Sequence, residues 1–312
     1  MNIIFFGTSD FAAGVLDSLL QKSCDILAIV TRPDRPQGRS LQMQPSPVKQ
    51  LYLQKQLSIP LYQPERASTS EFAEVLRRFT PDLFVVVAYG EIMKTNLLDI
   101  PKKGCINIHP SLLPKYRGAA PIPRSLMDGC LKTGVSIIEM VLQMDAGDLL
   151  AQEELVIPSN MNGAQLQQAL LQMSCSLVWH VIENFDSCYL AKKRQDPSQV
   201  TFAAKVHPED RQIFWVKKAE EVHNLIRALA PSPGAWCKIK MGDEVKRMTI
   251  KKSSVVEGVS LPPGTILSLK PEWIIACGNN AIRIEELQLE GKQSVLTKQF
   301  INGLKSNIEI VY

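Results

Sequence analysis

Residues 104–129 carry the sequence GCINIHPSLLPKYRGAAPIPRSLMDG, which begins as a β-strand and continues as an irregular loop. Successive side chains of a strand face opposite sides, so Asn107 and His109 share one face while Ile106 and Ile108 share the other. Pro110 removes a backbone donor and ends regular pairing, which places His109 at the carboxyl end of the strand. Ligands bind at that end of open parallel sheets. The same pattern is also typical of a histidine that merely caps a buried strand.

The amino-terminal part of the chain alternates short apolar segments with amphipathic ones. The predicted elements are a strand at 3–6, a turn at 7–10, a helix at 11–20, a strand at 26–30, a helix at 47–56 and a strand at 83–87. Ser9 or Asp10 is the expected cap of the first helix. This pattern predicts a doubly wound α/β domain with a mostly parallel sheet. After Gly7 the next glycine is Gly14, inside the helix, so the G-x-G-x-x-G fingerprint is missing and no nucleotide cofactor is expected.

The composition is that of an ordinary globular protein. The chain has 312 residues, of which 45% are hydrophobic and 21% charged, and its net charge is +4 at pH 7. The length favours two domains, and the weak positive charge permits a polyanionic partner without requiring one. The 7 cysteines are scattered without C-x-x-C spacing, which predicts free thiols, no metal site and a reducing cytoplasm. With no apolar run near the roughly 18 residues of a membrane span, we expect no membrane association.

A proline-rich segment at 31–49, TRPDRPQGRSLQMQPSPVK, is too long for an ordinary βα connection. Arg32, Arg35 and Arg39 lie in it, and Asp34 is their acidic neighbour. Such arginines fit either a solvated basic loop or a finger that contacts phosphates.

A predicted hairpin follows the opening stretch, with strands at 135–142 and 149–157. The turn between them, QMDAGD, contains Asp145. A carboxylate in a turn is commonly a local cap, so its position alone does not make it catalytic. Residues 163–185 then predict a long amphipathic helix in which His180 is a packing residue.

The carboxyl-terminal part predicts a second, smaller domain. A polar connection at 190–207 leads to a helix at 219–230 and to strands at 237–241, 245–251, 264–269, 273–277 and 281–289. Closely spaced short strands are typical of a small, OB-like β-barrel. Basic residues concentrate on its first strands, including Lys246 and Arg247, and they fit either a solvated face or contacts to phosphates. The predicted domains are 1–189 and 208–312.

Several motifs together resemble one family. The segments NIHPSLLPKYRGAAPI and TGVSIIEMVLQMDAGDLL resemble the signature of the 10-formyltetrahydrofolate-dependent formyltransferases, and FGTSDFA, TRPDRPQGR, PSPVK, VVVAYG and the PSPGAW segment are similar to the branch that acts on initiator tRNA. The resemblance covers essentially the whole chain. It implies a Rossmann-like formyltransferase domain followed by the barrel, with 10-formyltetrahydrofolate as co-substrate and initiator methionyl-tRNA as partner.

The resemblance also assigns residues by position. It implies that Asn107, His109 and Asp145 are catalytic, with Asn107 and His109 stabilising an oxyanion and Asp145 orienting His109, which moves the proton. Cys105 shares their strand face and is expected to be a packing thiol. The implied folate-binding residues are Val87, Ala88, Tyr89, Gly90, Ser111, Leu112, Leu113 and Pro114.

The same resemblance implies that the 31–49 loop enters the tRNA acceptor stem. The expected tRNA contacts are Arg35, Arg39, Lys246 and Arg247. Relatives often carry lysines after the Gly-Arg pair, whereas this chain has SLQMQ at 40–44, so Arg35 and Arg39 would bear more of the contact. A monomer is expected by resemblance. Formyl transfer to a glycinamide ribonucleotide or an amino sugar, hydrolysis of the formyl-folate, and a tRNA-binding protein on a decayed enzyme scaffold stay open as alternatives.

Overall fold

The computed structural model describes residues 1–37, 42–304 and 308–311. They form two compact units. The first comprises Met1–Gly118, Thr133–Leu155 and Gln167–Phe202, and the second comprises Ala119–Lys132, Val156–Leu166 and Ala203–Tyr312. The chain therefore passes between the units more than once, and the sequence-based boundaries at 189 and 208 stay a prediction.

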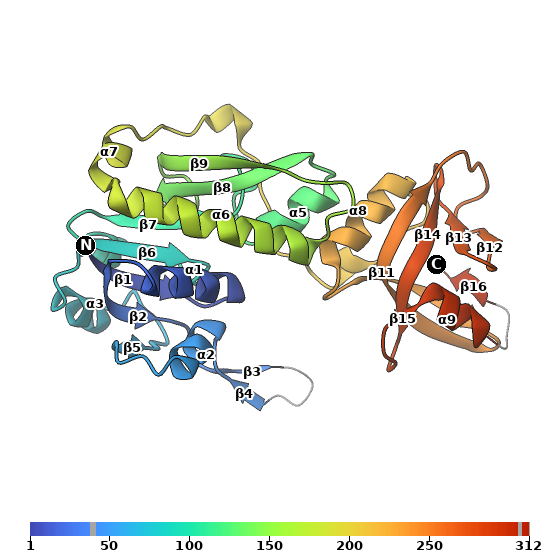
Figure 1. Ribbon diagram of the computed structural model, residues 1–312, viewed down its shortest axis with the longest axis horizontal. Helices are drawn as coiled ribbons and strands as arrows, with labels where there is room; N and C mark the ends of the chain where they lie inside the picture. Colours follow the sequence, from blue (N-terminus) through green and yellow to red (C-terminus); the bar gives the residue numbers. More distant parts are fainter. Residues whose placement is uncertain (38–41, 305–307, 312) are drawn as a thin grey trace. The chain divides into compact units, whose positions relative to one another are not determined.

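A largely parallel sheet organises the first unit (Figure 1). Within the described residues it has seven strands, in the order β5-β2-β1-β6-β7-β8-β9. Their bounds are β1 (Asn2–Gly7), β2 (Asp25–Val30), β5 (Leu61–Tyr62), β6 (Leu83–Val87), β7 (Cys105–His109), β8 (Lys132–Glu139) and β9 (Leu149–Val156). Strand β1 pairs in parallel with β2 and β6, β6 pairs in parallel with β7, and β7 pairs antiparallel with β8. The predicted fold class of this unit is confirmed.

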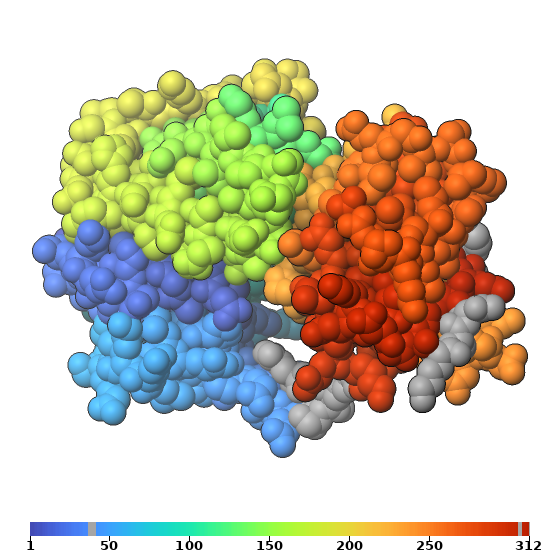
Figure 2. Space-filling view, turned by 45° about the vertical axis from the view of Figure 1, so that its right-hand side comes forward, coloured from blue at the N-terminus to red at the C-terminus, as the bar shows by residue number. Residues whose placement is uncertain are grey.

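Helices cover both faces of this sheet. They are α1 (Asp10–Leu20), α2 (Pro47–Gln54), α3 (Ser70–Arg77), α4 (Thr95–Leu98), α6 (Gly163–Glu183) and α7 (Phe185–Leu190). Ile4 and Phe6 of β1 pack in a core with Leu76 of α3, while α1 and α6 pack against each other through Gly14 and Leu171. A Cβ at Gly14 would lie 2.6 Å from a Leu171 methyl carbon, so this glycine permits the close approach. Figure 2 shows the yellow-green residues of α6 bordering the dark blue residues of α1.

The proline-rich segment at 31–49 contains a short hairpin. Strands β3 (Arg35–Gln37) and β4 (Gln42–Gln44) pair antiparallel, with Arg35 opposite Gln44 and Pro36 opposite Met43. The prolines of this segment hid the ladder from sequence analysis, because proline is normally evidence against a strand. It is tolerated here because the ladder is an isolated two-stranded one. Arg39 lies outside the described residues.

The second unit contains an antiparallel, barrel-like sheet, which confirms the other half of the predicted fold class. Among the described residues its strands follow the order β12-β13-β14-β11-β10-β16, and β15 pairs with β14. The strands are β10 (Ala235–Met241), β11 (Glu244–Val256), β12 (Ile266–Ser268), β13 (Trp273–Ala276), β14 (Ala281–Leu289), β15 (Val295–Leu296) and β16 (Ile308–Val311). The helices are α5 (Pro121–Met127), α8 (Ala219–Leu229) and α9 (Thr297–Asn302), with a 3-10 turn η2 (Glu209–Arg211).

The core of this unit is aromatic and aliphatic. Trp215 and Trp273 are fully buried, and the ring of Trp273 stacks on Phe300 of α9 at 5.7 Å between centroids. The second predicted barrel strand ends at residue 251, whereas β11 continues to Val256 across a bulge after Ile250. Helix α9 and strand β16 were not predicted, because their apolar residues are too few to show a period by themselves.

Candidate active site

His109 is the last residue of β7, as predicted, and it is 4% exposed. Its Nε2 lies 2.9 Å from the carbonyl oxygen of Tyr116 in the loop that follows. A carbonyl oxygen only accepts, so Nε2 carries a hydrogen and donates it. The other ring nitrogen, Nδ1, is therefore the atom available for proton exchange.

Asp145 faces that second nitrogen. Its Oδ2 lies 3.8 Å from His109 Nδ1, which is longer than a hydrogen bond but within ion-pair distance of a protonated ring. The same oxygen accepts a 2.7 Å hydrogen bond from the backbone N–H of Gly118. The structure thus brings together a histidine that the sequence places at a strand end and a carboxylate that it places in a later turn.

Asn107 lies two positions before His109 on the same face of β7, and it is half-buried. Within the described part of the chain, no residue forms a hydrogen bond with its side-chain amide. Cys105 behaves differently, because its Sγ donates to the carbonyl of Leu98 at 3.6 Å and burial raises the pKa of its thiol. A buried thiol with a raised pKa is an unreactive packing residue.

A polar network fixes the SLLP loop after β7. The hydroxyl of Ser136 on β8 donates to the carbonyl of Ser111 at 2.7 Å and accepts from the N–H of Leu113 at 3.1 Å. The amide nitrogen of Gln152 on β9 donates to the same hydroxyl at 2.8 Å and to the carbonyl of Leu113 at 2.9 Å. Of the four predicted folate residues here, Ser111 and Leu113 are buried, whereas Leu112 and Pro114 are partly exposed.

The loop after β6 lies beside this one, because β6 and β7 are parallel neighbours with Val86 opposite Asn107. Ala88 and Gly90 are exposed and have positive φ values of 42° and 86°, whereas Val87 and Tyr89 are buried. The hydroxyl of Tyr89 has no hydrogen-bond partner among the described residues, and burial raises its pKa. The exposed backbone of this loop suits a heterocycle that both donates and accepts hydrogen bonds, whereas the Tyr89 hydroxyl is buried in the core.

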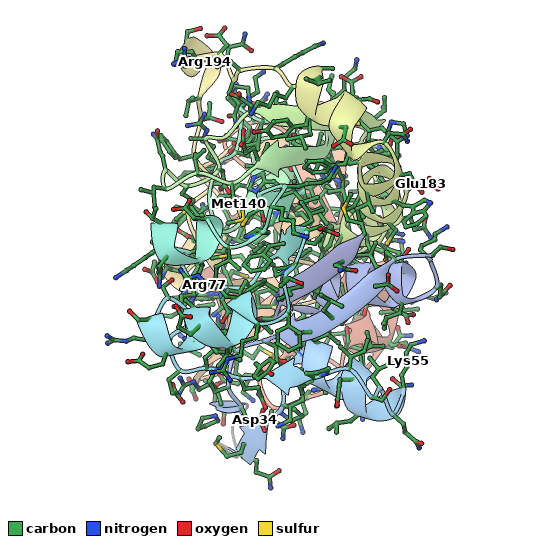
Figure 3. All side chains as sticks on the ribbon, turned by 90° about the vertical axis from the view of Figure 1, so that its left-hand side faces the viewer. Asp34, Lys55, Arg77, Met140, Glu183 and Arg194 are labelled. Atoms are coloured by element: carbon green, nitrogen blue, oxygen red, sulfur yellow. The ribbon has the colours of Figure 1, made fainter. Side chains whose placement is uncertain are left out.

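Residues that flank the hairpin of β3 and β4 anchor it to the rest of the first unit. Asp34, labelled in Figure 3, accepts a 2.8 Å hydrogen bond from Gln63 and pairs with Lys49 at 2.8 Å. These two contacts hold the pKa of the Asp34 carboxyl below its usual value. Arg35 pairs with Glu65 at 2.5 Å and is more than half exposed, so its guanidinium is accessible.

The basic residues predicted in the barrel do not share one face. Arg247 lies opposite Lys238 across β10 and β11, and its guanidinium stacks over the Trp236 ring at 4.1 Å. Lys246 lies opposite the buried Ile239, on the other side of β11, and pairs with Glu244 at 2.5 Å. Alternation along the strand separates the two side chains, although they are adjacent in sequence.

Four further side chains support this site, and none of them is a predicted site residue. Ser136 and Gln152 lie on the predicted hairpin, and Arg117 and Gln195 lie in segments treated as a loop and a connection. All four side chains form hydrogen bonds to residues distant in sequence. A serine inside the apolar strand GVSII is the one local signal that could have been found.

Over the described ranges, no helix is long and apolar enough to cross a bilayer. Searched over the same residues, His, Cys, Asp and Glu side chains form no group of three suited to a metal ion.

Comparisons with known proteins cover nearly the whole chain. The formyl transferase family matches residues 1–182, and its C-terminal domain family matches residues 205–305. The methionyl-tRNA formyltransferase of Protochlamydia amoebophila is 46% identical over 308 residues, covering 98% of this chain and 96% of the relative. The enzyme of the same name from Geobacter metallireducens is 36% identical over 306 residues, with 98% and 96% covered.

Solved structures agree in fold at low identity. HypX from Aquifex aeolicus, in complex with tetrahydrofolic acid, matches with a TM-score of 0.64 at 17% identity, over 98% of this chain and 48% of that protein. The sugar 3N-formyl transferase WlaRD, crystallised in the presence of dTDP and 5-N-formyl-THF, also matches with a TM-score of 0.64 at 17% identity, over 94% of this chain and 99% of that one. The family matches and the identity to these relatives establish that the chain belongs to the formyl transferase family, in the group whose curated members are methionyl-tRNA formyltransferases.

Proposed function

We propose that this protein transfers the formyl group of 10-formyltetrahydrofolate to the α-amino group of methionyl initiator tRNA. The observation that carries the proposal is the 46% identity to a methionyl-tRNA formyltransferase along nearly the full length of both chains. The geometry of Asn107, His109 and Asp145 supports it, because formyl transfer between nitrogens needs a donor for a developing oxyanion and a group that moves a proton.

Asn107 is the oxyanion donor in this mechanism. When the amine attacks the formyl carbon, negative charge develops on the formyl oxygen, and a pre-positioned N–H stabilises that charge. Asn107 is half-buried, and its side-chain amide is not hydrogen-bonded to any described residue. It is therefore free to donate to the formyl oxygen without breaking an existing contact.

His109 moves the proton through Nδ1. Its Nε2 hydrogen is held by the Tyr116 carbonyl, so Nδ1 accepts the proton of the attacking amine and returns it to the leaving nitrogen of the folate. The carboxylate of Asp145, 3.8 Å away, stabilises the positive charge that forms on the ring. In its protonated state Nδ1–H is also a second donor to the formyl oxygen.

The loops after β6 and β7 hold the folate. The residues that would line its site are those of the 87–90 loop, which exposes backbone at Ala88 and Gly90, and those of the SLLP loop, which partly exposes Leu112 and Pro114. When bound, the folate supplies the formyl group.

Contacts to tRNA come from both units. Arg35 and Arg39 of the 31–49 loop bind phosphates of the acceptor stem, and the barrel domain at 208–312 adds basic residues such as Arg247 and Lys246. The exposed guanidinium of Arg35 supports the first contact, and the stack of Arg247 on Trp236 supports the second. The protein acts as a monomer in the cytoplasm, with residues 190–207 connecting its domains.

One assay tests the function. The protein is incubated with 10-formyltetrahydrofolate labelled in the formyl group and with methionine-charged initiator tRNA, and label is expected in N-formylmethionine esterified to the tRNA. A charged tRNA whose α-amine is acetylated is the matched control and should stay unlabelled. Label transferred to a glycinamide ribonucleotide or an amino sugar, or released as formate, would contradict the proposal in favour of another family activity.

A further inference from the structure

Gln195 connects two turns of the candidate site, namely the turn at 145–147 and the turn at 116–118 in the loop after β7. It follows α7 and is 5% exposed, in a segment that the sequence predicts as a polar connection. Its side-chain nitrogen donates two hydrogen bonds of 2.8 Å, to the carbonyls of Asp145 and Gly147. Its side-chain oxygen accepts from Arg117 Nε at 3.1 Å and from a terminal guanidinium nitrogen at 2.7 Å.

The chemistry of these partners fixes the orientation of the amide. The carbonyls of Asp145 and Gly147 only accept, and the guanidinium of Arg117 only donates. A rotated amide would direct its oxygen at two carbonyls and its N–H groups at a cation. Because every polar atom of the Gln195 side chain is engaged and buried, any other residue type leaves buried groups of the turn or of Arg117 unpaired.

Arg117 occupies the matching position in the other turn. It is 7% exposed and lies between Tyr116, whose carbonyl accepts from His109, and Gly118, whose N–H donates to Asp145. The backbone of residues 116–118 contacts both His109 and Asp145, and the guanidinium of Arg117 joins this segment to Gln195.

Both turns adopt a backbone conformation that L-residues rarely adopt. Tyr116 has a φ of 62° and Asp145 has a φ of 52°, in the left-handed region. A non-glycine residue persists there only when surrounding contacts hold it, and such residues cluster at functional sites. The hydrogen bonds of Gln195 to the Asp145 and Gly147 carbonyls are contacts of that kind.

The segment around Gln195 is anchored at both of its ends. Lys193 exchanges two backbone hydrogen bonds with Leu149, at 2.8 and 2.9 Å. The hydroxyl of Thr201 accepts from the N–H of Tyr116 at 2.9 Å, and the carbonyl of Thr201 accepts from the N–H of Arg117 at 2.9 Å. Residues 193–201 therefore form a strap over the two turns, with Gln195 as its buried side chain.

We propose that Gln195 and Arg117 are positioning residues for formyl transfer, which lock the Asp145 turn to the loop after His109 so that the carboxylate faces Nδ1. The proposal rests on the proposed function, because it assigns the pair a role only through Asp145 and His109. Neither side chain touches substrate in this scheme. Loss of the pair should lower turnover without weakening the binding of either substrate.

The test uses two variants and a control in the full-length protein. Gln195→Leu removes all four hydrogen bonds at similar volume, and Gln195→Glu keeps the acceptor for Arg117 but directs an oxygen at the two carbonyls. For both we expect kcat to fall at least about tenfold, with KM for folate and for tRNA within about twofold of wild type. Gln199→Leu is the matched control, because among the described residues its exposed amide donates only to Asp196, at 3.0 Å in the same segment. It should keep wild-type kcat.

A double-mutant cycle separates positioning from general support of the fold. In an Asp145→Ala background the positioning target is gone, so Gln195→Leu should lower kcat by less than about twofold further. Equal losses in both backgrounds, or folding failure of both Gln195 variants in thermal unfolding, would assign the residue to the fold and overturn the proposal. Unchanged kcat in an active Gln195→Leu protein would overturn the positioning role alone, whereas a wild-type protein that transfers no formyl group contradicts the proposed function itself.

Discussion

The carboxylate of Asp145 accepts a 2.7 Å hydrogen bond from the backbone N–H of Gly118. That bond joins the turn before β9 to the loop after β7, and the same oxygen lies 3.8 Å from the imidazole of His109. The proposed catalytic pair is therefore held through backbone contacts of the two turns and not by a direct bond between the side chains. This arrangement leaves Nδ1 of His109 free to exchange a proton.

The Asp145→Asn variant tests the negative charge of the Asp145 side chain separately from its position. The asparagine keeps an oxygen that can accept from Gly118, so thermal stability should stay close to wild type. A unit charge about 4 Å away at a partly buried site contributes a few kcal/mol, so its loss should lower kcat on the order of a hundredfold. Asp145→Ala removes the Gly118 contact as well and should also lower the unfolding temperature. Steady-state kinetics and thermal unfolding of the two variants measure the difference, and normal turnover of Asp145→Asn would remove the charge from the mechanism.

Asn107→Ala and His109→Ala test the oxyanion donor and the proton carrier. Truncation of an oxyanion donor costs on the order of a hundredfold or more in turnover, and we expect each variant to lose most activity while it still binds folate. The measurements are kcat by formyl transfer and folate affinity by titration with tetrahydrofolate. Asn160→Ala and His180→Ala are controls at exposed positions, because His180 is exposed on α6 and is not the packing residue that the sequence predicts. Either site variant with near-normal kcat would exclude that residue from catalysis.

Ser136→Ala tests the support of the SLLP loop. The change leaves the N–H of Leu113 and the carbonyl of Ser111 without their buried partner, which should cost about 1–3 kcal/mol of the free energy of unfolding. If the loop holds folate, KM for folate should rise while KM for tRNA stays unchanged. Ser125→Ala is the control, because in the described part of the chain that buried hydroxyl donates only within its own helix, to the carbonyl of Ile122. A folate KM unchanged in Ser136→Ala would separate the loop from folate binding.

The paired change Arg35→Ala and Arg39→Ala tests the tRNA contact of the 31–49 loop. Removal of two phosphate contacts should raise KM for tRNA and reduce the slope of log kcat/KM against log salt concentration by about one per arginine. Kinetics across a salt series measure this slope. Arg77→Ala, at an exposed position on α3, is the control. An unchanged slope would identify the two arginines as part of a solvated surface.

Local sequence predicted most elements of the first unit. Apolar runs predict the strands β1, β2, β6 and β7, and Pro110 predicts the end of β7. The hydroxyl of Ser9 predicts the cap of α1, because its partner is within a few residues. The sequence did not predict the hairpin of β3 and β4, because its prolines are normally evidence against a strand. Helix α9 and strand β16 did not follow either, because they are ordered by packing around Trp273 and against β10.

By itself, the sequence determined the parallel sheet, the barrel and the placement of His109 at a strand end, since these depend on periodicity and on proline within short segments. Three relations emerge from the tertiary structure alone. Nδ1 of His109 faces Asp145, and the Asn107 amide has no hydrogen-bond partner among the described residues. Gln195 joins the Asp145 turn to Arg117 in the loop after β7. The physical reason is that these relations join residues far apart in the chain. Their distances are fixed by strand register and by buried hydrogen bonds, which leave no periodic trace in sequence.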